Sequence, residues 1–594
     1  MRLRWKLLSL CCAAALAAGF GGLGAGTAYA DTGTAVGAAA GTAADGAAAA
    51  GTESGAAAET IPAKTAPTEF AHIYECYISG DQVVLDGQME GTFSDPNYYD
   101  NYLYLFEQKP YQRSLEGRSD YIGWITKGDA LHFSVPLNHG TAEDRLYSSF
   151  VVAVYDGNEY IQVSNEAYVT NPEAVARYND PYKGGQTKKG LLIQTTPDMV
   201  ADAFELGVNH VIVNIPFSHI LGSGIDFTYD GKTYHFSKDV LAVYDDTIRR
   251  MSEKNMTVTA VILNDWNDST PQLYYPGVTR QPAGTANYYG FHVATEDGYE
   301  TLRAIAAFLA DRYSSLQSPY GRVSNWVIGN EINNQLWNYM GPMSLDTYME
   351  EYVRAFRVFY TAIRSTSSTS RVFFSTDYNW MHEADGRLKY NARDVLDTFN
   401  SKVVPGGPMD WEFAYHPYSI PLVEPEFWND AETGLITYNY DSPVVNMINL
   451  EVMTNYLQQE HFRMRDGKPR HVILSEQGFT STSLSRGQVD ELQAAAIAYA
   501  YYIADSNDLI DAFIMSRQVD APSEVATSLS FGLWHCDTNQ PNDIVPTMRK
   551  QSWTVYKNID NRSATLEITE KYKSLIGIEK WSDVIPNFRW RSME

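Results

Sequence analysis

The pattern of apolar and polar positions changes character about a third of the way along the chain. From residue 68 to residue 178, short runs such as ALHFSVPL alternate between apolar and polar residues, and turn residues such as Asp-Gly separate them. A period of two at this spacing predicts a β-sandwich. No constellation of ionisable residues stands out in this segment. We therefore interpret it as a structural or spacer domain, with carbohydrate binding as the alternative.

Continuous apolar runs replace the alternating pattern between residues 185 and 594. Strands that are buried on both faces, as in a parallel sheet covered by helices, have this pattern. Helical segments such as LDTYMEEYVRAFRVFYTAIRS lie between the runs. Eight alternations of strand and helix predict an α/β fold, a (β/α)8 barrel with large loops and C-terminal helices. The predicted strands are 190–196, 210–216, 257–265, 325–331, 371–377, 411–418, 471–478 and 511–517.

The N-terminal residues predict export. Basic residues precede the apolar run from Leu7 to Ala18, and Ala28-Tyr29-Ala30 is typical of a cleavage site, so we interpret residues 1–30 as a signal peptide. The run is too short to predict a membrane span. Residues 31–67 are almost all Ala, Gly, Thr, Ser and Asp, which predicts a disordered linker. We expect a secreted or extracellular protein, and the linker is suited to association with a cell surface or cell wall.

Composition narrows the expected partners. The chain has 45 Lys and Arg against 72 Asp and Glu, a net charge of −27, and such an acidic protein repels nucleic acid. After the signal peptide only Cys76 and Cys536 remain, which excludes a disulfide framework. Aromatic residues make up 13% of the chain, and this content suits a protein that binds sugars as well as a secreted β-rich protein. The oligomeric state stays open.

Two glutamates at predicted strand ends make a definite chemical proposal. In a (β/α)8 barrel the catalytic groups lie at the carboxyl ends of the strands. Strand 4 ends in Asn330-Glu331 and strand 7 in Ser475-Glu476, and closure of the barrel brings these ends to face each other. Carboxyl groups about 5–5.5 Å apart suit retaining glycoside hydrolysis. One carboxyl must be protonated while the other is ionised, and their mutual repulsion separates the two pKa values.

The same strand ends resemble those of the clan A glycoside hydrolases, which are retaining enzymes on a (β/α)8 barrel. The resemblance covers residues 185–560 and rests on Asn-Glu after strand 4, Glu on strand 7, His-x-Tyr after strand 6 and an aromatic residue after strand 8. It implies that Glu331 is the acid/base, that Glu476 is the nucleophile and that Asn330 binds the 2-hydroxyl group of the sugar.

The resemblance also implies roles for three further residues. Tyr418 is expected to donate a hydrogen bond to the nucleophile, and His416 to line the same wall. Trp534 is expected to form the platform under the reactive sugar. Strands 2 and 3 depart from the pattern, because Asn214 and Asp265 stand where many clan A families have an Arg and a His. The polar surroundings of the nucleophile therefore differ, and the substrate class cannot be transferred.

Other candidates follow strand ends without a motif. Asp265 is expected to bind substrate, with a loop cap as the alternative. Trp337 and Trp380 are expected to stack on sugar rings, with packing of the loops as the alternative. The dipeptide His382-Glu383 lacks the second histidine of a zinc helix, and we expect neither a metal nor a cofactor.

Taken together, the sequence predicts a secreted retaining glycoside hydrolase that acts on a polysaccharide or oligosaccharide. The main alternative is a non-catalytic carbohydrate-binding surface protein on a degenerate barrel. A barrel hydrolase of esters or amides is disfavoured, because the sequence contains no motif for a Ser or Cys nucleophile or for a metal cluster. The sugar, its linkage, its anomeric configuration and exo or endo action stay open.

Overall fold

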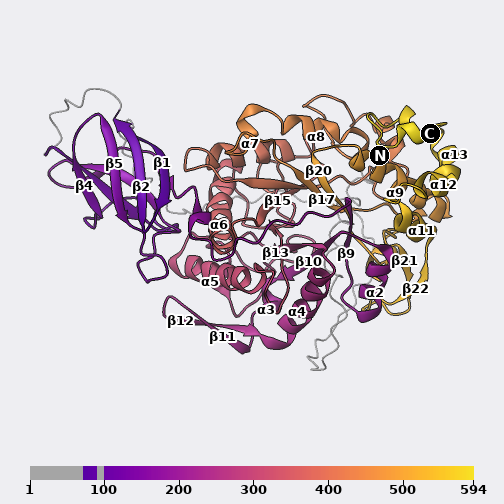
Figure 1. The fold of residues 1–594 in the computed structure, drawn as a ribbon, viewed down its shortest axis with the longest axis horizontal. Helices are drawn as coiled ribbons and strands as arrows, with labels where there is room; N and C mark the ends of the chain where they lie inside the picture. The colour runs from indigo at the N-terminus through magenta and orange to yellow at the C-terminus, as the bar shows by residue number, and fades with distance from the viewer. Residues whose placement is uncertain (1–70, 90–99) are drawn as a thin grey trace, which may run out of the picture.

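The chain folds into an antiparallel β part and an eight-stranded parallel barrel, at the left and right of Figure 1. The computed structural model describes residues 71–89 and 100–594. The predicted signal peptide (1–30) and linker (31–67) lie outside the described residues. The predicted domain boundaries at residues 178 and 185 fall between the 3₁₀ helix η1, which ends at Val175, and the first barrel strand, which begins at Lys189.

The N-terminal part consists of two antiparallel sheets, as the alternating pattern predicts. One sheet has the order β1-β2-β5, and the other has the order β4-β3-β6-β7 with β8 paired to β6. Buried and exposed residues alternate strictly along β5, so that one face of the strand joins the hydrophobic core. The strands are β1 (Ala71–Ser79), β2 (Gln82–Met89), β3 (Tyr102–Gln108), β4 (Gly123–Thr126), β5 (Ala130–Pro136), β6 (Ser149–Tyr155), β7 (Tyr160–Gln162) and β8 (Ala167–Tyr168).

The apolar runs form a closed parallel barrel, which confirms the predicted fold class. The strands follow one another around the barrel in chain order, and the last strand pairs with the first. Two runs have the predicted bounds, and the others end within a few residues of them. The barrel strands are β9 (Lys189–Leu192), β10 (His210–Pro216), β13 (Thr257–Leu263), β14 (Asn325–Ile328), β15 (Arg371–Asp377), β16 (Trp411–His416), β17 (Val472–Gln477) and β20 (Ile510–Met515).

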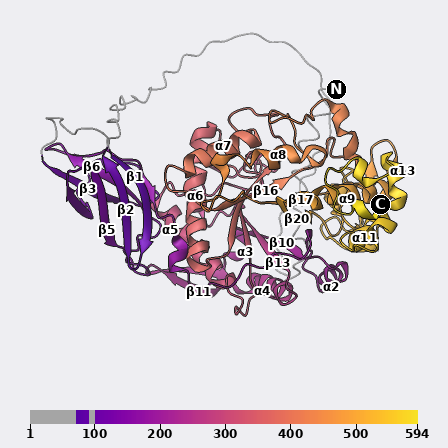
Figure 2. The same cartoon turned by 45° about the horizontal axis from the view of Figure 1, so that its top comes forward.

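Helices surround the barrel, as Figure 2 shows. The longest begins after Ser344, whose hydroxyl accepts a hydrogen bond from the Thr347 N–H at the helix N-terminus. The helices are α2 (Pro197–Leu206), α3 (Phe217–Ile220), α4 (Lys238–Glu253), α5 (Glu296–Tyr313), α6 (Leu345–Thr366), α7 (Ala392–Val403), α8 (Glu451–Tyr456), α9 (Asp490–Asp505), α10 (Pro522–Val525), α11 (Gln551–Asn558), α12 (Thr565–Thr569) and α13 (Lys573–Ile576).

Short antiparallel strand pairs lie in the loops of the barrel. The predicted turn at Tyr229 to Lys232 joins β11 (Gly224–Tyr229) to β12 (Lys232–Ser237), and Asp230 and Gly231 have φ angles of +46° and +77°. A two-residue turn with both central residues at positive φ is the usual hairpin connection. The other pairs are β18 (Thr482–Ser483) with β19 (Gly487–Gln488), and β21 (Trp534–Cys536) with β22 (Pro546–Arg549).

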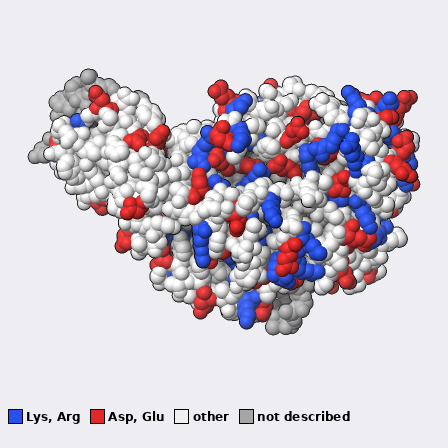
Figure 3. All heavy atoms as spheres, in the orientation of Figure 1, with Lys and Arg blue, Asp and Glu red and all other residues white. Residues whose placement is uncertain are grey.

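Polar contacts join the N-terminal sheets to helix α6. Arg354 donates hydrogen bonds to Glu166, at 2.8 Å, and to the hydroxyl of Tyr168, while Arg113 pairs with Glu351 at 3.0 Å. On the face shown in Figure 3, acidic and basic side chains are interspersed over the barrel, and the N-terminal sheets carry few charges. Among the described residues, no helix is both long and apolar enough to cross a membrane. Cys76 and Cys536 are free thiols.

Candidate active site

Glu331 lies in a tight turn that follows barrel strand β14. The strand ends at Ile328, and Gly329 then takes a φ angle of +77°. Glu331 itself has a φ angle of +38°, which is uncommon and strained for a residue with a side chain. Its N–H donates to the Ser375 hydroxyl at 2.9 Å, so β15 holds the turn. This strained turn places the buried side chain of Glu331 at the end of the barrel where the strands terminate.

Glu476 lies at an irregularity in strand β17. Leu474 pairs with Phe513 on β20, and Gln477 pairs with Met515, so β17 has one residue more than its partner between the two pairs. A β-bulge of this kind redirects side chains and is frequent next to active sites. Because of the extra residue, both Ser475 and Glu476 reach the end of the neighbouring strand β16. The bulge explains how two consecutive residues can face the same cluster.

The end of β16 contacts both residues of the bulge. The Tyr418 hydroxyl donates a hydrogen bond to Glu476 Oε1 at 2.8 Å, as the resemblance implies. His416 lies between the two strands that carry the glutamates. Its Nδ1 is 2.8 Å from Glu331 Oε1, and its Nε2 is 3.0 Å from the Ser475 Oγ.

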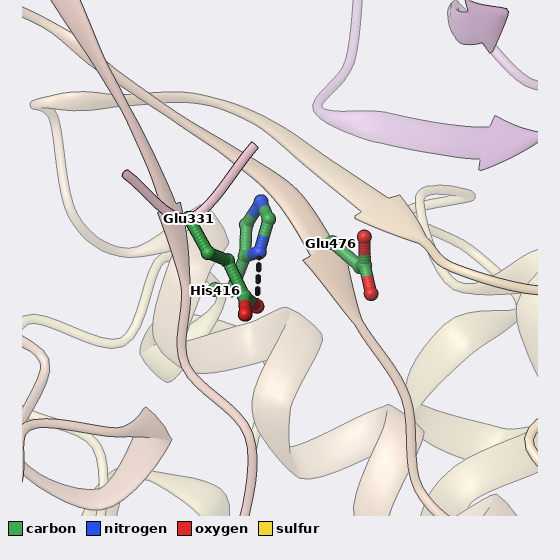
Figure 4. Close-up of side chains that lie close together, drawn as sticks. All are labelled: Glu331, His416 and Glu476. Atoms are coloured by element: carbon green, nitrogen blue, oxygen red, sulfur yellow. Dashed lines mark hydrogen bonds and ion pairs between the residues drawn. The ribbon is translucent and has the colours of Figure 1, made fainter. Parts of the chain in front are cut away.

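The two predicted carboxyl groups meet at the mouth of the barrel. A carboxylate oxygen of Glu331, a carboxylate oxygen of Glu476 and a ring nitrogen of His416 all lie within 4.8 Å of one another. Figure 4 shows the three side chains, with His416 against Glu331 and with Glu476 facing them from its own strand. Glu331 and His416 are 6% and 2% exposed, whereas Glu476 is half-buried. The geometry therefore brings together the residues that the sequence analysis pairs.

The surroundings of the two glutamates favour different protonation states. Burial raises the pKa of Glu331 well above its usual range, and the nearby Asp377 carboxylate raises it further. Burial also raises the pKa of Glu476, and the Glu331 carboxyl adds to the rise, whereas His416, the Tyr418 hydrogen bond and the nearby Arg517 guanidinium oppose it. Glu331, whose pKa is raised more, is therefore the better suited of the two to hold a proton, and Glu476 is the better suited to be ionised. Burial lowers the pKa of His416, so its imidazole is neutral at neutral pH.

Asn330 lies beside this pair with an unused donor. Its side chain is 3% exposed and lines the same cavity as His416 and Glu476. Its Nδ2 has no hydrogen-bond partner among the described residues. A buried amide N–H without a partner costs free energy, which a bound hydroxyl group can recover. The position suits the predicted contact with a sugar hydroxyl.

The three predicted tryptophans are buried or held by hydrogen bonds of their indole groups. Trp337 is 1% exposed and packs in the apolar interior of the barrel, and Trp380 is fully buried and donates to the Tyr440 carbonyl at 2.9 Å. Trp534 Nε1 donates to Asp202 on helix α2 at 3.1 Å, which holds the indole against the outer helices. Trp337 and Trp380 are too buried to stack on a sugar in this structure and fit the alternative of loop packing, whereas stacking by the half-buried Trp534 stays a prediction.

Asp265 follows strand β13, at the position that the sequence predicts. Its carboxylate accepts hydrogen bonds from the N–H of Ser218, at 2.9 Å, and from the Ser218 hydroxyl. It lines a separate cavity at the ends of β10 and β13, together with Trp266 and Tyr288. Substrate binding by Asp265 therefore stays a prediction, and its hydrogen bonds fit the alternative of a loop cap.

Sequence reasoning missed Ser475 and Ser375 as parts of the site. Ser475 contacts His416 and Ser375 holds the turn at Glu331. A serine beside a candidate glutamate carries no signal in the sequence, because the bulge that turns both side chains toward the site depends on pairing with β20. The tyrosine pair at residues 288 and 289 could be noticed in the sequence. Burial raises the pKa of Tyr288, and the nearby Asp265 and Glu476 carboxylates raise it further.

Glu331, His416 and Glu476 also form the type of ligand set that could hold a metal ion. Two carboxylates and an imidazole suit several divalent metals. Both ring nitrogens of His416 already have partners, Glu331 and Ser475, and a metal ligand would have to give up one of them. The donor set alone therefore fits a metal less well than the hydrogen-bonded arrangement that the structure has.

The fold and the site define the chain as a (β/α)8-barrel protein with a buried glutamate pair at the carboxyl ends of strands 4 and 7. A family of unknown function, DUF5722, matches residues 181–584. The chain therefore belongs to the DUF5722 family. No curated protein matches its sequence.

Solved structures with a similar fold share little sequence with the chain. A family 39 glycoside hydrolase from the gut symbiont Bacteroides cellulosilyticus WH2 is 16% identical, with a TM-score of 0.42, over 81% of this chain and 80% of that one. A Bacteroides uniformis β-glucuronidase is 12% identical, with a TM-score of 0.33, over 82% and 49%. A β-glucosidase from Pyrococcus furiosus is 13% identical, with a TM-score of 0.37, over 63% and 85%.

Proposed function

We propose that the protein is a retaining glycoside hydrolase that cleaves a polysaccharide or oligosaccharide. One observation carries the proposal: Glu331 and Glu476 have carboxylate oxygens within 4.8 Å of each other, in surroundings that raise the pKa of the first more than that of the second. This separation suits a retaining mechanism, because inverting enzymes leave about 6.5–9.5 Å between the carboxyl groups for a water molecule. The predicted signal peptide supports the further proposal that the enzyme is secreted.

The first step forms a glycosyl-enzyme. Glu476 attacks the anomeric carbon while Glu331 gives its proton to the departing glycosidic oxygen. The Tyr418 hydroxyl, which donates to Glu476 Oε1, leaves the second oxygen of this carboxylate for the attack. The unpartnered Asn330 Nδ2 is available to a hydroxyl group of the same sugar. The second step reverses the roles: Glu331 takes a proton from water, and the water displaces Glu476 from the anomeric carbon.

His416 is suited to orient the acid. A neutral imidazole donates through one nitrogen and accepts through the other. If the Ser475 hydroxyl donates to Nε2, then Nδ1 carries the hydrogen and donates to Glu331 Oε1. The proton of Glu331 then stays on Oε2, where it is free to face the leaving group. The Nδ1–H tautomer serves both steps, because Oε1 accepts the same hydrogen bond in either protonation state.

A screen of 4-nitrophenyl glycosides and of plant, fungal and bacterial polysaccharides tests the proposal. We expect turnover of at least one class, with a first-formed product of retained configuration in NMR spectra. First-formed product of inverted configuration would exclude the two-step mechanism. Turnover that EDTA abolishes and zinc restores would favour a metal at Glu331, His416 and Glu476. Binding of a glycan without any turnover would favour the non-catalytic alternative.

Replacing Tyr418 by Phe is expected to shift the acid limb of the pH profile. The variant loses the hydrogen bond that stabilises ionised Glu476, so the pKa of this carboxyl rises further. The rise of activity on the acid side of the profile then occurs at higher pH. We expect kcat/KM to fall about tenfold, which corresponds to the free energy of one charge-assisted hydrogen bond. The control is Tyr415→Phe on the same strand, which loses a hydrogen bond to the Val445 carbonyl and should leave the limb unmoved. An unmoved limb in the Tyr418 variant would contradict the assigned contact.

Replacing Ser475 by Ala is expected to disturb the acid through His416. Without the hydroxyl, the Nδ1–H tautomer is no longer favoured, and ionised Glu331 loses part of its stabilisation. We expect kcat to fall about fivefold to tenfold. The alkaline limb of the pH profile should move to higher pH, because the pKa of Glu331 rises. Ser475→Thr keeps the hydroxyl and should restore the limb, whereas a loss of activity without a shifted limb would indicate a purely structural serine.

A further inference from the structure

A second cavity opens beside the carboxyl pair, at the ends of β9, β10 and β20. It is a neighbour of the cavity that Glu476 lines, because Leu192 and Asn214 line both. Its other polar walls come from Gln194, Ser516 and Arg517. The space between these walls, including the part open to solvent, is about 530 Å³.

The cavity lies on the side of the nucleophile. In the barrel, β20 is the neighbour of β17, and the Ser516 N–H donates to the Gln477 carbonyl at 2.9 Å, directly after Glu476. Strand β14, which carries Glu331, lies across the barrel from β9 and β20. In the proposed mechanism the nucleophile attacks the sugar that stays on the enzyme, and the acid faces the sugar that leaves. The cavity is therefore on the side of the sugar that stays, the glycone.

Two buried polar atoms of residues that line this cavity have no partner among the described residues. They are the Ser516 Oγ and the Gln194 Oε1. The Ser516 side chain is 5% exposed, and the Gln194 Nε2 is fixed by the Ile544 carbonyl at 2.8 Å, so the free oxygen of this amide is held in place. Burying such groups without hydrogen bonds is costly, so each is a place where a ligand or an ordered water can supply the partner. Sugar hydroxyl groups both donate and accept, and can satisfy the two.

The charge of the cavity is balanced within the protein. Arg517 is the charged residue in the lining, and its Nε donates to the buried Glu524 carboxylate at 3.0 Å. Arg517 and Glu524 are 6% and 0% exposed. Burial raises the pKa of Glu524 to about 7, and above that pH the ionised pair leaves no net positive charge for an anionic group of a ligand. A sulfated sugar or a uronic acid would bring an unmatched negative charge close to Glu476.

From these observations we propose that the cavity is a glycone subsite for an uncharged sugar ring, with Ser516 and Gln194 as specificity-determining residues. The proposal rests on the proposed function, which assigns the nucleophile, and it adds the substrate class. It differs from the usual strand-8 tryptophan platform, because Trp534 lies against helix α2. In this chain hydrogen bonds to hydroxyl groups take the place of ring stacking.

Binding of free monosaccharides tests the subsite without any turnover. We expect saturation-transfer NMR signals from at least one of glucose, galactose, mannose and xylose with the wild type, and none from glucuronic acid. Thr195→Phe, at the half-exposed wall of the cavity, should abolish these signals by filling the space. Sugar signals that persist in Thr195→Phe, no signal from any neutral sugar, or a stronger signal from glucuronic acid would each overturn the proposal.

Kinetics on the best 4-nitrophenyl monoglycoside separate this proposal from the proposed function. Ser516→Ala should lower kcat/KM about 10-fold to 100-fold, because one hydroxyl contact of a buried sugar is lost. The matched control is Ser314→Ala, which removes another buried hydroxyl without a partner, at the end of helix α5. If turnover is unchanged in Ser516→Ala, the proposed glycone subsite is contradicted but the proposed function is not. If the wild type binds a sugar, Thr195→Phe abolishes this binding and no glycoside is cleaved, the proposed function is contradicted but the subsite is not.

Discussion

Replacing Glu476 by Ala should abolish turnover of the best glycoside and make the remaining reaction depend on added azide. The carboxylate is the attacking group in the first step, and loss of a nucleophile costs on the order of 10⁴-fold or more in kcat. The truncation leaves a space beside the anomeric carbon that a small anion can enter. Azide then attacks from the face that Glu476 uses, and the product should be a glycosyl azide of inverted configuration.

The azide product identifies the role of the residue, which loss of activity alone cannot do. A buried structural glutamate would also lose activity on truncation, but azide would not restore it. The control is Glu432→Ala, an exposed glutamate in the 3₁₀ helix that follows β16, and this variant should keep full activity. If azide gives a product of retained configuration with Glu476→Ala, the assignments of the two glutamates must be exchanged.

The barrel could be predicted from the sequence because each parallel strand is buried on both faces. The runs HVIVNIP and RVFFSTD have strand bounds that agree with β10 and β15. The pair of glutamates could be predicted for the same reason, because the fold sends the carboxyl ends of all strands to one end of the barrel. Chain order around a closed barrel then determines which strand ends face each other. The positions of the two glutamates can therefore be predicted without knowing the path of the loops.

The aromatic residues could not be predicted, because their surroundings depend on the path of long loops. Trp337 and Trp380 follow strand ends, as a sugar platform would, but burial of a large ring in an apolar interior is more favourable than exposure at a cleft. Trp534 lies in a loop that returns from β20, and its indole N–H finds Asp202, far away in sequence. No local pattern contains that contact.

The bulge in β17 shows why the supporting residues also escaped prediction. An ideal strand would turn Ser475 and Glu476 to opposite faces, and only one of them could reach the site. The bulge brings both to β16, where His416 and Tyr418 each contact one of them. The two glutamates are thus linked through neighbouring residues of two strands. A change at Ser475 should therefore alter the pKa of Glu331 through His416, although Ser475 and Glu331 belong to different strands.

Replacing Glu331 by Gln should produce a loss of activity that depends on the leaving group. General acid catalysis contributes about 10²-fold to 10⁴-fold, and the loss should have this size for substrates with a poor leaving group, such as an unmodified oligosaccharide. A 2,4-dinitrophenyl glycoside needs no proton on departure, so its first step should stay fast. The glycosyl-enzyme then accumulates, because the second step lacks its base, and a burst of dinitrophenol precedes slow turnover.

Added azide and the pH profile complete the assignment of Glu331. Azide needs no base, so it should accelerate turnover of the glycosyl-enzyme and give a glycosyl azide of retained configuration, opposite to the Glu476→Ala product. The wild type should lose activity as the pH rises through the raised pKa of Glu331, and the variant should lack this alkaline limb. The control is Glu383→Gln, another glutamate at positive φ after a barrel strand, but exposed. An equal loss for all leaving groups would mean that Glu331 supports the site without transferring a proton.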